Sequence, residues 1–251
     1  MKRFLMRISY DGTFFNGWQS QKKGRTVQQI LEKALSEIAK QPITVVGSGR
    51  TDAGVHAFRQ YAHFDFPVQM TPNQIVLALR AKLPQDVSVS RIFPVKDDFH
   101  ARYNAVQRKY IYFITTNPTP FTRFYRTYFP KTFISLNKIR TTVSYFTGKH
   151  DFTSFSKFNP DIKTTICEIS DFQVTEKQDD IIFEISANRF LHNMVRRIIG
   201  TIVNISRTNT NPDIVSQLIE MKNPQHKLIS TAPPQGLFLA EVKYPKNSFQ
   251  F

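Results

Sequence analysis

The chain has 251 residues, which suffices for one large domain or two small ones. Because 41% of the residues are hydrophobic and 21% are charged, the composition is that of a chain with a packed core and not of a disordered one. Its 34 Lys and Arg against 19 Asp and Glu give a net charge of +15, which favours a polyanion partner, and its 23 Phe and 9 Tyr could stack on exposed bases. It has no apolar run near the ~20 residues of a membrane helix and no signal peptide, so we expect a soluble cytoplasmic protein. Its one cysteine, Cys167, leaves no room for a disulfide framework or a multi-cysteine zinc site.

The first half of the chain predicts six elements in the order β-α-β-β-α-β. Alternating apolar residues from Phe4 to Tyr10 predict a half-buried strand. Residues 26–40 predict a helix with a capping box of Thr26 and Gln29, and Pro72 begins a second helix after Thr71. Strands are expected over residues 43–46, 57–66 and 87–95. This order is that of ferredoxin-like domains.

The second half predicts the same order of elements. Strands are expected over residues 107–115, 165–175, 180–187 and 238–244, and helices over the residues after Ser135 and over residues 190–205, with a short extra helix over 212–221. We therefore predict an α+β fold of two ferredoxin-like or RRM-like β-α-β-β-α-β halves with antiparallel sheets and either a cleft or a continuous sheet between them. The predicted domains are residues 1–103 and 104–251.

A glycine-rich loop between two predicted strands holds the best candidate for chemistry. Residues 47–57 read Gly-Ser-Gly-Arg-Thr-Asp-Ala-Gly-Val-His-Ala, and the glycines allow a tight backbone that presents Asp52 to solvent. A lone carboxylate indicates a nucleophile or general base more than a metal cage. A plain turn or a phosphate-binding nest are the alternatives, and we expect His56 to be structural.

Six motifs in order give the chain a specific resemblance. Residues 49–57 resemble the signature loop of the tRNA pseudouridine synthase A family. The other motifs lie in residues 10–19, 99–110, 148–152, 190–196 and 231–237, so the resemblance spans nearly the whole chain. Ser48 stands where the family would lead us to expect alanine.

The resemblance implies an isomerase that converts uridine to pseudouridine at positions 38, 39 and 40 of the tRNA anticodon stem-loop. The N1–C1′ bond breaks and a C5–C1′ bond forms without redox change, so no cofactor or metal is implied. The target base must leave the helix to be reached. The resemblance also implies a homodimer, the domains described above and a catalytic cleft between them.

By the same resemblance, Asp52 is the catalytic carboxylate, and attack on C1′, addition to C6 and deprotonation of C2′ remain open as its role. Tyr110 would stack on the target base, and Arg50 would help to evert it or contact a phosphate. Arg196 borders the apolar stripe of its predicted helix, so we expect it to pair with Asp52 and lower the pKa of that carboxyl; a phosphate contact is its alternative. We expect His100, Arg102 and Arg108 to line the RNA path.

Two other functions are weighed. One is a non-catalytic RNA-binding protein with two RRM-like sheets, although the chain lacks a clear RNP1 signature of aromatics around glycine. The other is a metal-dependent nuclease that would use Asp11, Asp52 and Asp65.

Overall fold

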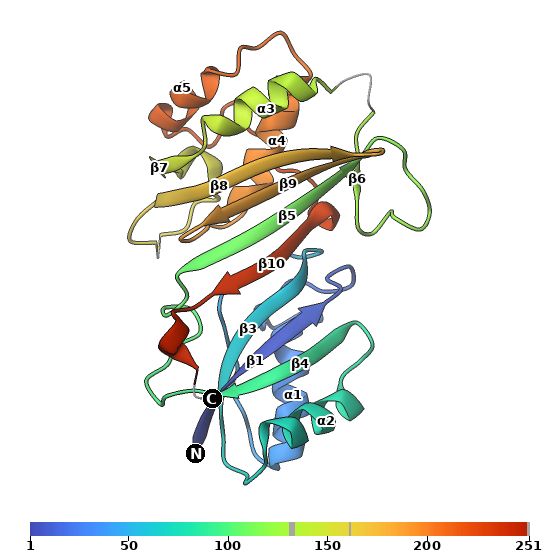
Figure 1. Ribbon diagram of the computed structural model, residues 1–251, viewed down its shortest axis with the longest axis vertical. Helices are drawn as coiled ribbons and strands as arrows, with labels where there is room; N and C mark the ends of the chain where they lie inside the picture. The colour runs from blue at the N-terminus through green and yellow to red at the C-terminus, as the bar shows by residue number, and fades with distance from the viewer. Residues whose placement is uncertain (131–133, 161, 250–251) are drawn as a thin grey trace. The chain divides into compact units, whose positions relative to one another are not determined.

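A computed structural model describes residues 1–130, 134–160 and 162–249 of the chain (Figure 1). By contacts between residues it divides into two compact units, Met1–Gln107 with Phe238–Phe251, and Arg108–Leu237. No helix within the described ranges is long and apolar enough to cross a membrane.

The first unit places two helices on one face of an antiparallel sheet (Figure 1). Within it, strand β1 pairs with β3 and β4, and the short β2 pairs with the C-terminal half of β3. The order is therefore β4-β1-β3-β2. This is the strand order expected of a ferredoxin-like unit. The elements are β1 (Lys2–Tyr10), α1 (Val27–Ala39), β2 (Val46–Gly47), β3 (His56–Phe66), α2 (Pro72–Lys82) and β4 (Val87–Pro94).

The helix caps show why these segments are helical. The Thr26 hydroxyl accepts the Gln29 N–H at the start of α1, although the Gln29 side chain bonds to the Thr26 hydroxyl and not to its backbone, so the predicted box is half formed. At α2 the capping box of Thr71 and Gln74 is complete, with Pro72 in the first turn.

Strand β1 is buried on more than one face. Phe4, Met6, Ile8 and Tyr10 are buried as their alternation predicts, but Leu5 is fully buried as well. Leu5 lies in a second small cluster with Val95, Phe99 and Ala101, against which Tyr61, Tyr244 and Phe249 pack. The expectation of a half-buried strand is therefore wrong at this point, because the chain after β4 folds back over the outer face of the sheet.

The second unit contains the antiparallel strands β5 (Gln107–Thr115), β9 (Asp180–Ala187), β8 (Ile166–Lys177) and β7 (Gly148–Asp151) in that order, with the short β6 (Thr127–Tyr128) parallel to β5. Its helices are α3 (Leu136–Ser144), α4 (Met194–Ser206) and α5 (Ile214–Met221). Short 3-10 turns cover Thr153–Phe155 and Pro234–Gly236 here and Lys246–Ser248 in the first unit. Cys167 is fully buried.

Strand β10 (Leu237–Lys243) is the last strand in chain order. It pairs in parallel with β3, Phe238 opposite His56 and Leu239 opposite Ala57, and Val106 donates its N–H to the Lys243 carbonyl. Because of these bonds, the residues from Phe238 onward belong to the first compact unit. From the sequence alone, they are predicted to belong to a domain of residues 104–251. The α+β class, with antiparallel sheets in both halves, is confirmed.

Candidate active site and its family

The loop between β2 and β3 carries Arg50 and Asp52, as predicted. Asp52 is partly exposed and Arg50 is exposed. The Val55 N–H donates to the Asp52 carbonyl over 3.1 Å, and Gly54 takes a φ of 76°, so the chain turns tightly just after the carboxylate. The turn presents Asp52 to solvent on a fixed backbone, which is what a catalytic carboxylate requires.

Strand β3 holds this loop through a buried glutamine. The Gln60 side chain, fully buried, donates to the Gly49 carbonyl over 3.0 Å and accepts the Ser48 hydroxyl proton. Ser48 also donates its N–H to the Tyr61 carbonyl over 2.7 Å. The serine that stands in place of the expected alanine is therefore built into the anchor of the loop.

The N-terminal segment holds the loop from the other side. Trp18 donates its N–H to the Thr51 carbonyl over 3.1 Å. At Gly17, which has a φ of 86°, a Cβ would lie 2.6 Å from that same carbonyl oxygen, and at Gly12 a Cβ would lie 2.0 Å from the Val55 oxygen. Both positions need glycine because two backbones approach closely. Sequence reasoning gave neither glycine a role; the signal was their place in the motif of residues 10–19.

His56, which ends the loop, is structural, as expected. It is 1% exposed, its Nδ1 accepts the Gly12 N–H over 3.0 Å, and its ring stacks on Phe238 at 4.5 Å between centroids. The imidazole thus links the N-terminal segment to the start of β3.

Tyr110 lies on β5 in the second unit, opposite Ile185 of β9. Its ring is partly exposed and meets the edge of Phe190 at a centroid distance of 5.2 Å, with the two planes at 88°.

Arg196 lies in the first turn of α4, which begins at Met194, four residues later than predicted. The delay has a local cause, because Asn193 has a φ of 61° and interrupts the helical backbone. The Arg196 Nε donates to the Ala232 carbonyl over 2.8 Å, and Ala232 returns its N–H to the Arg196 carbonyl over 3.0 Å. The neighbouring Arg197 is partly buried and donates to the Pro224 carbonyl.

The segment over residues 230–236 is fixed against α4 and β5. The Tyr112 hydroxyl donates to the Pro233 carbonyl over 2.8 Å and lies 2.7 Å from the Thr127 hydroxyl oxygen, and burial raises the pKa of Tyr112. A Cβ on Gly200 would meet the Ser230 oxygen at 2.2 Å. Arg196 therefore sits in a rigid frame built from the last of the six motifs.

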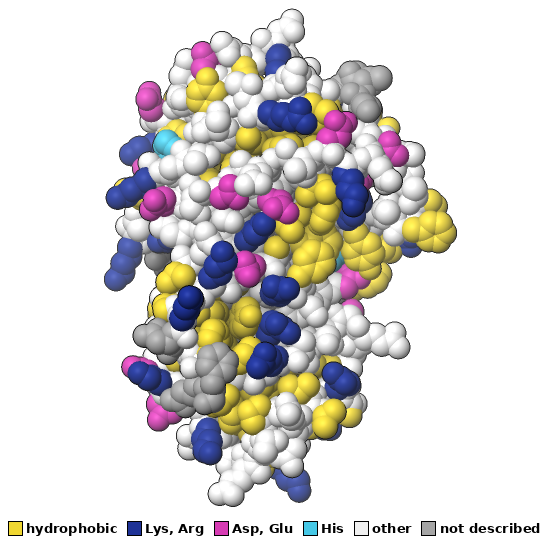
Figure 2. Space-filling view, viewed as in Figure 1, with side chains coloured by type: hydrophobic (Ala, Val, Ile, Leu, Met, Phe, Trp, Pro, Cys, Tyr) yellow, Lys and Arg dark blue, Asp and Glu magenta, His cyan; other side chains and the backbone are white. Residues whose placement is uncertain are grey.

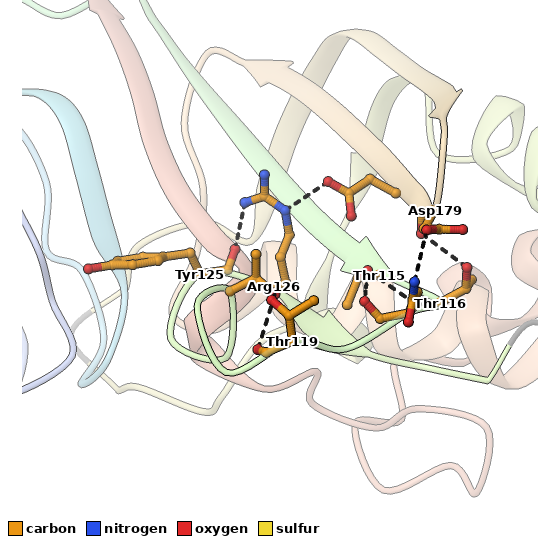
Figure 3. Close-up of polar contacts among 9 residues, drawn as sticks. Thr115, Thr116, Thr119, Tyr125, Arg126 and Asp179 are labelled. Carbon is orange, nitrogen blue, oxygen red and sulfur yellow. Dashed lines mark hydrogen bonds and ion pairs between the residues drawn. The ribbon is translucent and has the colours of Figure 1, made fainter.

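Basic and aromatic side chains are interleaved on the surface, as the composition suggested. On the face in Figure 2, Lys and Arg side chains lie among exposed hydrophobic ones. Not every arginine is available to RNA. In the loop after β5, Arg126 donates to Asp180 over 2.9 Å and to the Tyr125 carbonyl over 2.9 Å (Figure 3), and its guanidinium lies over Phe113.

Two of the three carboxylates of the nuclease alternative, Asp11 and Asp65, are engaged in contacts within the fold. Asp11 accepts the Thr13 hydroxyl and N–H, and Asp65 forms a two-bond ion pair with Arg3 at 2.8 Å. Across the part of the chain that the structure describes, no three His, Cys, Asp or Glu residues gather as metal ligands.

Comparison with known proteins decides the family. A model of the family described as tRNA pseudouridine synthase matches residues 6–104 and 142–245. The chain belongs to this family. A protein of Bacteroides fragilis named tRNA pseudouridine synthase A is 40% identical over 254 residues, covering 100% of this chain and 99% of the relative. One of the same name from Exiguobacterium sibiricum is 36% identical over 98% of each chain.

Among solved structures, an H/ACA RNP bound to a substrate RNA containing 2′-deoxyuridine aligns at 11% identity over 78% of this chain and 44% of that chain, with a TM-score of 0.37. A likeness this weak carries no argument. The family resemblance read from the six motifs is thus confirmed by the sequence relatives.

The roles of single residues are a separate matter. Asp52, Arg50 and Arg196 lie within the ranges that match the tRNA pseudouridine synthase family, whereas Tyr110 falls between them. Asp52 and Arg50 belong to the first unit and Tyr110 and Arg196 to the second. Their roles, and the pairing of Arg196 with Asp52, stay predictions.

Proposed function

We propose that this protein isomerises uridine to pseudouridine in tRNA, at positions 38, 39 and 40 of the anticodon stem-loop, with Asp52 as the catalytic carboxylate. Family membership over nearly the whole chain is the observation that carries the proposal. The loop geometry supports it, because the residues on either side of Asp52 are bonded to the N-terminal segment: Trp18 donates its N–H to the Thr51 carbonyl and Gly54 donates its N–H to the Phe15 carbonyl.

The reaction exchanges one bond to the sugar for another. The N1–C1′ bond breaks, the base turns, the C5–C1′ bond forms, N1 gains a proton, and the proton on C5 leaves to solvent. Nothing is oxidised or reduced. Asp52 supplies a carboxylate, whether its oxygen attacks carbon or takes a proton.

The other site residues are assigned to the RNA. Tyr110 stacks on the everted uridine, and Arg50, exposed on the same loop as Asp52, helps to evert it or holds a phosphate. Arg196 supplies a positive charge to pair with Asp52. The partners are therefore tRNA and, by family resemblance, a second copy of the chain.

The test uses tRNA carrying tritium at C5 of uridine, because only isomerisation releases that tritium to water. The wild-type chain releases tritium, Asp52→Asn releases none, and Asp52→Asn still binds tRNA. Asp98→Asn, the same change at an exposed carboxylate of the first unit, retains wild-type release.

Two results would contradict the proposal. Binding without tritium release by the wild-type chain would indicate the non-catalytic RNA-binding protein. Joint loss of binding and release in Asp52→Asn would make Asp52 a structural residue. Mapping of pseudouridine in tRNA from cells that lack the protein then tests positions 38, 39 and 40.

A further inference from the structure

A tight turn after β4 is anchored on both sides of one buried residue. Ala101 is fully buried, donates its N–H to Nδ1 of His63 over 3.1 Å, and accepts the Tyr244 hydroxyl proton over 2.7 Å. The turn closes on itself, because His100 donates its N–H to the Asn104 side chain over 2.6 Å and Asn104 donates its N–H to the His100 carbonyl over 3.0 Å. The backbone of residues 100–104 is thus held firmly.

Three rings form a column that runs from the interior to solvent along this turn. The His63 and His100 rings lie 4.8 Å apart between centroids, and the His100 and Tyr103 rings lie 4.3 Å apart at 30°. His63 is 6% exposed, whereas Tyr103 is 76% exposed. The column therefore presents the outer surface of a tyrosine that is supported from behind.

The supporting imidazoles are neutral near pH 7. Nδ1 of His100 accepts the N–H groups of Arg102 and Tyr103 over 3.2 and 3.4 Å. Burial, with nearby arginines, lowers the pKa of His100 below its usual value and that of His63 to about 4. His100 is thus engaged in holding the turn, and the expectation that it lines the RNA path stays a prediction.

The surroundings of Tyr103 suit an RNA base better than a protein surface. Its sequence neighbours Arg102 and Asn104 are polar and exposed. The Arg102 guanidinium lies 5.7 Å from the ring centroid. An exposed aromatic beside a cation, in a chain of charge +15, is typical of surfaces that bind unpaired bases.

We propose that Tyr103 is a stacking platform for one unpaired base of the RNA substrate and that His100 is the positioning residue that supports it. The inference rests on the proposed function in taking the RNA to be tRNA. It concerns binding alone, because Tyr103 takes no part in bond exchange.

Equilibrium binding of unmodified tRNA tests the platform. Loss of one base stack is expected to raise the Kd of Tyr103→Ala by about 5- to 150-fold, while Tyr103→Phe, which keeps the ring, binds as the wild type does. Leu77→Ala, at a 61% exposed apolar residue on α2, is the control for removing exposed apolar surface. At saturating tRNA, Tyr103→Ala still releases tritium from C5, which separates failure of this inference from failure of the proposed function.

A fluorescent variant reports stacking directly and guards against misfolding. The natural tryptophan, Trp18, is 2% exposed, so Tyr103→Trp adds a surface fluorophore whose emission tRNA should quench. The His100→Ala change in that background should weaken the quenching. Equal Kd values for wild type and Tyr103→Ala, or no quenching, would overturn the inference. A change in oligomeric state of Tyr103→Ala with unchanged tRNA affinity would overturn it in favour of an interface between copies.

Discussion

The Tyr10 hydroxyl lies 2.8 Å from the hydroxyl oxygen of Thr51, and both side chains are buried. Tyr10 is the last residue of β1, and Thr51 immediately precedes Asp52. Burial raises the pKa of Tyr10, so the phenol stays neutral and able to donate at physiological pH. The end of the first strand therefore fixes the residue beside the proposed catalytic carboxylate.

Tyr10→Phe removes this contact and leaves the ring in place. The Thr51 hydroxyl then loses a buried partner, so we expect the free energy of unfolding to fall by ~1–2 kcal/mol and kcat to fall with it, while tRNA affinity is kept. Urea denaturation and single-turnover tritium release measure the two effects. Tyr128→Phe, at a 49% exposed tyrosine, is the matched control and should change neither.

Gly17 and Gly49 make a second matched pair. A methyl group at Gly17 would meet the Thr51 oxygen at 2.6 Å in a backbone of positive φ, whereas at Gly49 nothing lies within 4 Å. We expect Gly17→Ala to destabilise the fold by ~1–3 kcal/mol and to displace the Asp52 loop, with loss of activity.

Gly49→Ala should leave the denaturation midpoint unchanged. If it nevertheless lowers turnover, the space beside Gly49 is needed by the RNA and not by the fold. Equal midpoints for Gly17→Ala and wild type would show that the loop tolerates displacement, contrary to the packing described here.

Most of the fold could be predicted because short-range signals set it. The Thr71 capping box with Pro72 and the alternation from Phe4 to Tyr10 are local patterns, and the observed elements follow them. The start of α4 could not be predicted, because the apolar period runs through Asn193 although its backbone is left-handed. The grouping of β10 with the first unit also depends on long-range pairing, which no local pattern encodes.

The sequence motif predicted the candidate site, but it did not predict the residues that hold the site in place. Asp52 stands out in a glycine-rich loop, but Gln60 reads as an ordinary strand residue in the sequence and proves to be the buried anchor of that loop. Its bonds to Ser48 and Gly49 join residues that only the pairing of β2 with β3 brings together.

Protonation of His63 makes stability depend on pH. Its pKa is lowered from 6.5 to about 4 by burial and by nearby cationic groups, so between these values the unfolded chain binds more protons than the folded one. The contribution of neutral His63 to the free energy of unfolding is fully present above pH 6.5 and is lost as the pH falls towards 4. We expect urea midpoints to decline across that window.

In His63→Asn, an amide oxygen lies near the position of Nδ1, the wild-type acceptor of the Ala101 N–H, and the titrating imidazole is gone. The free energy of unfolding of this variant should therefore depend less on pH. His192→Asn, at an exposed histidine, should retain the wild-type slope. An unchanged slope in His63→Asn would assign the effect to other groups, of which His100, whose pKa is also lowered and whose ring lies 4.8 Å from that of His63, is the first candidate.

Two substitutions of Arg196 separate two roles for this side chain. If Arg196 acts through its positive charge, Arg196→Gln loses activity, whereas Arg196→Lys, which keeps the charge, retains much of it. If Arg196 instead acts by holding the Ala232 carbonyl through Nε, both variants lose activity equally, because neither reproduces that bond. Single-turnover rates, with circular dichroism to confirm folding, distinguish the two.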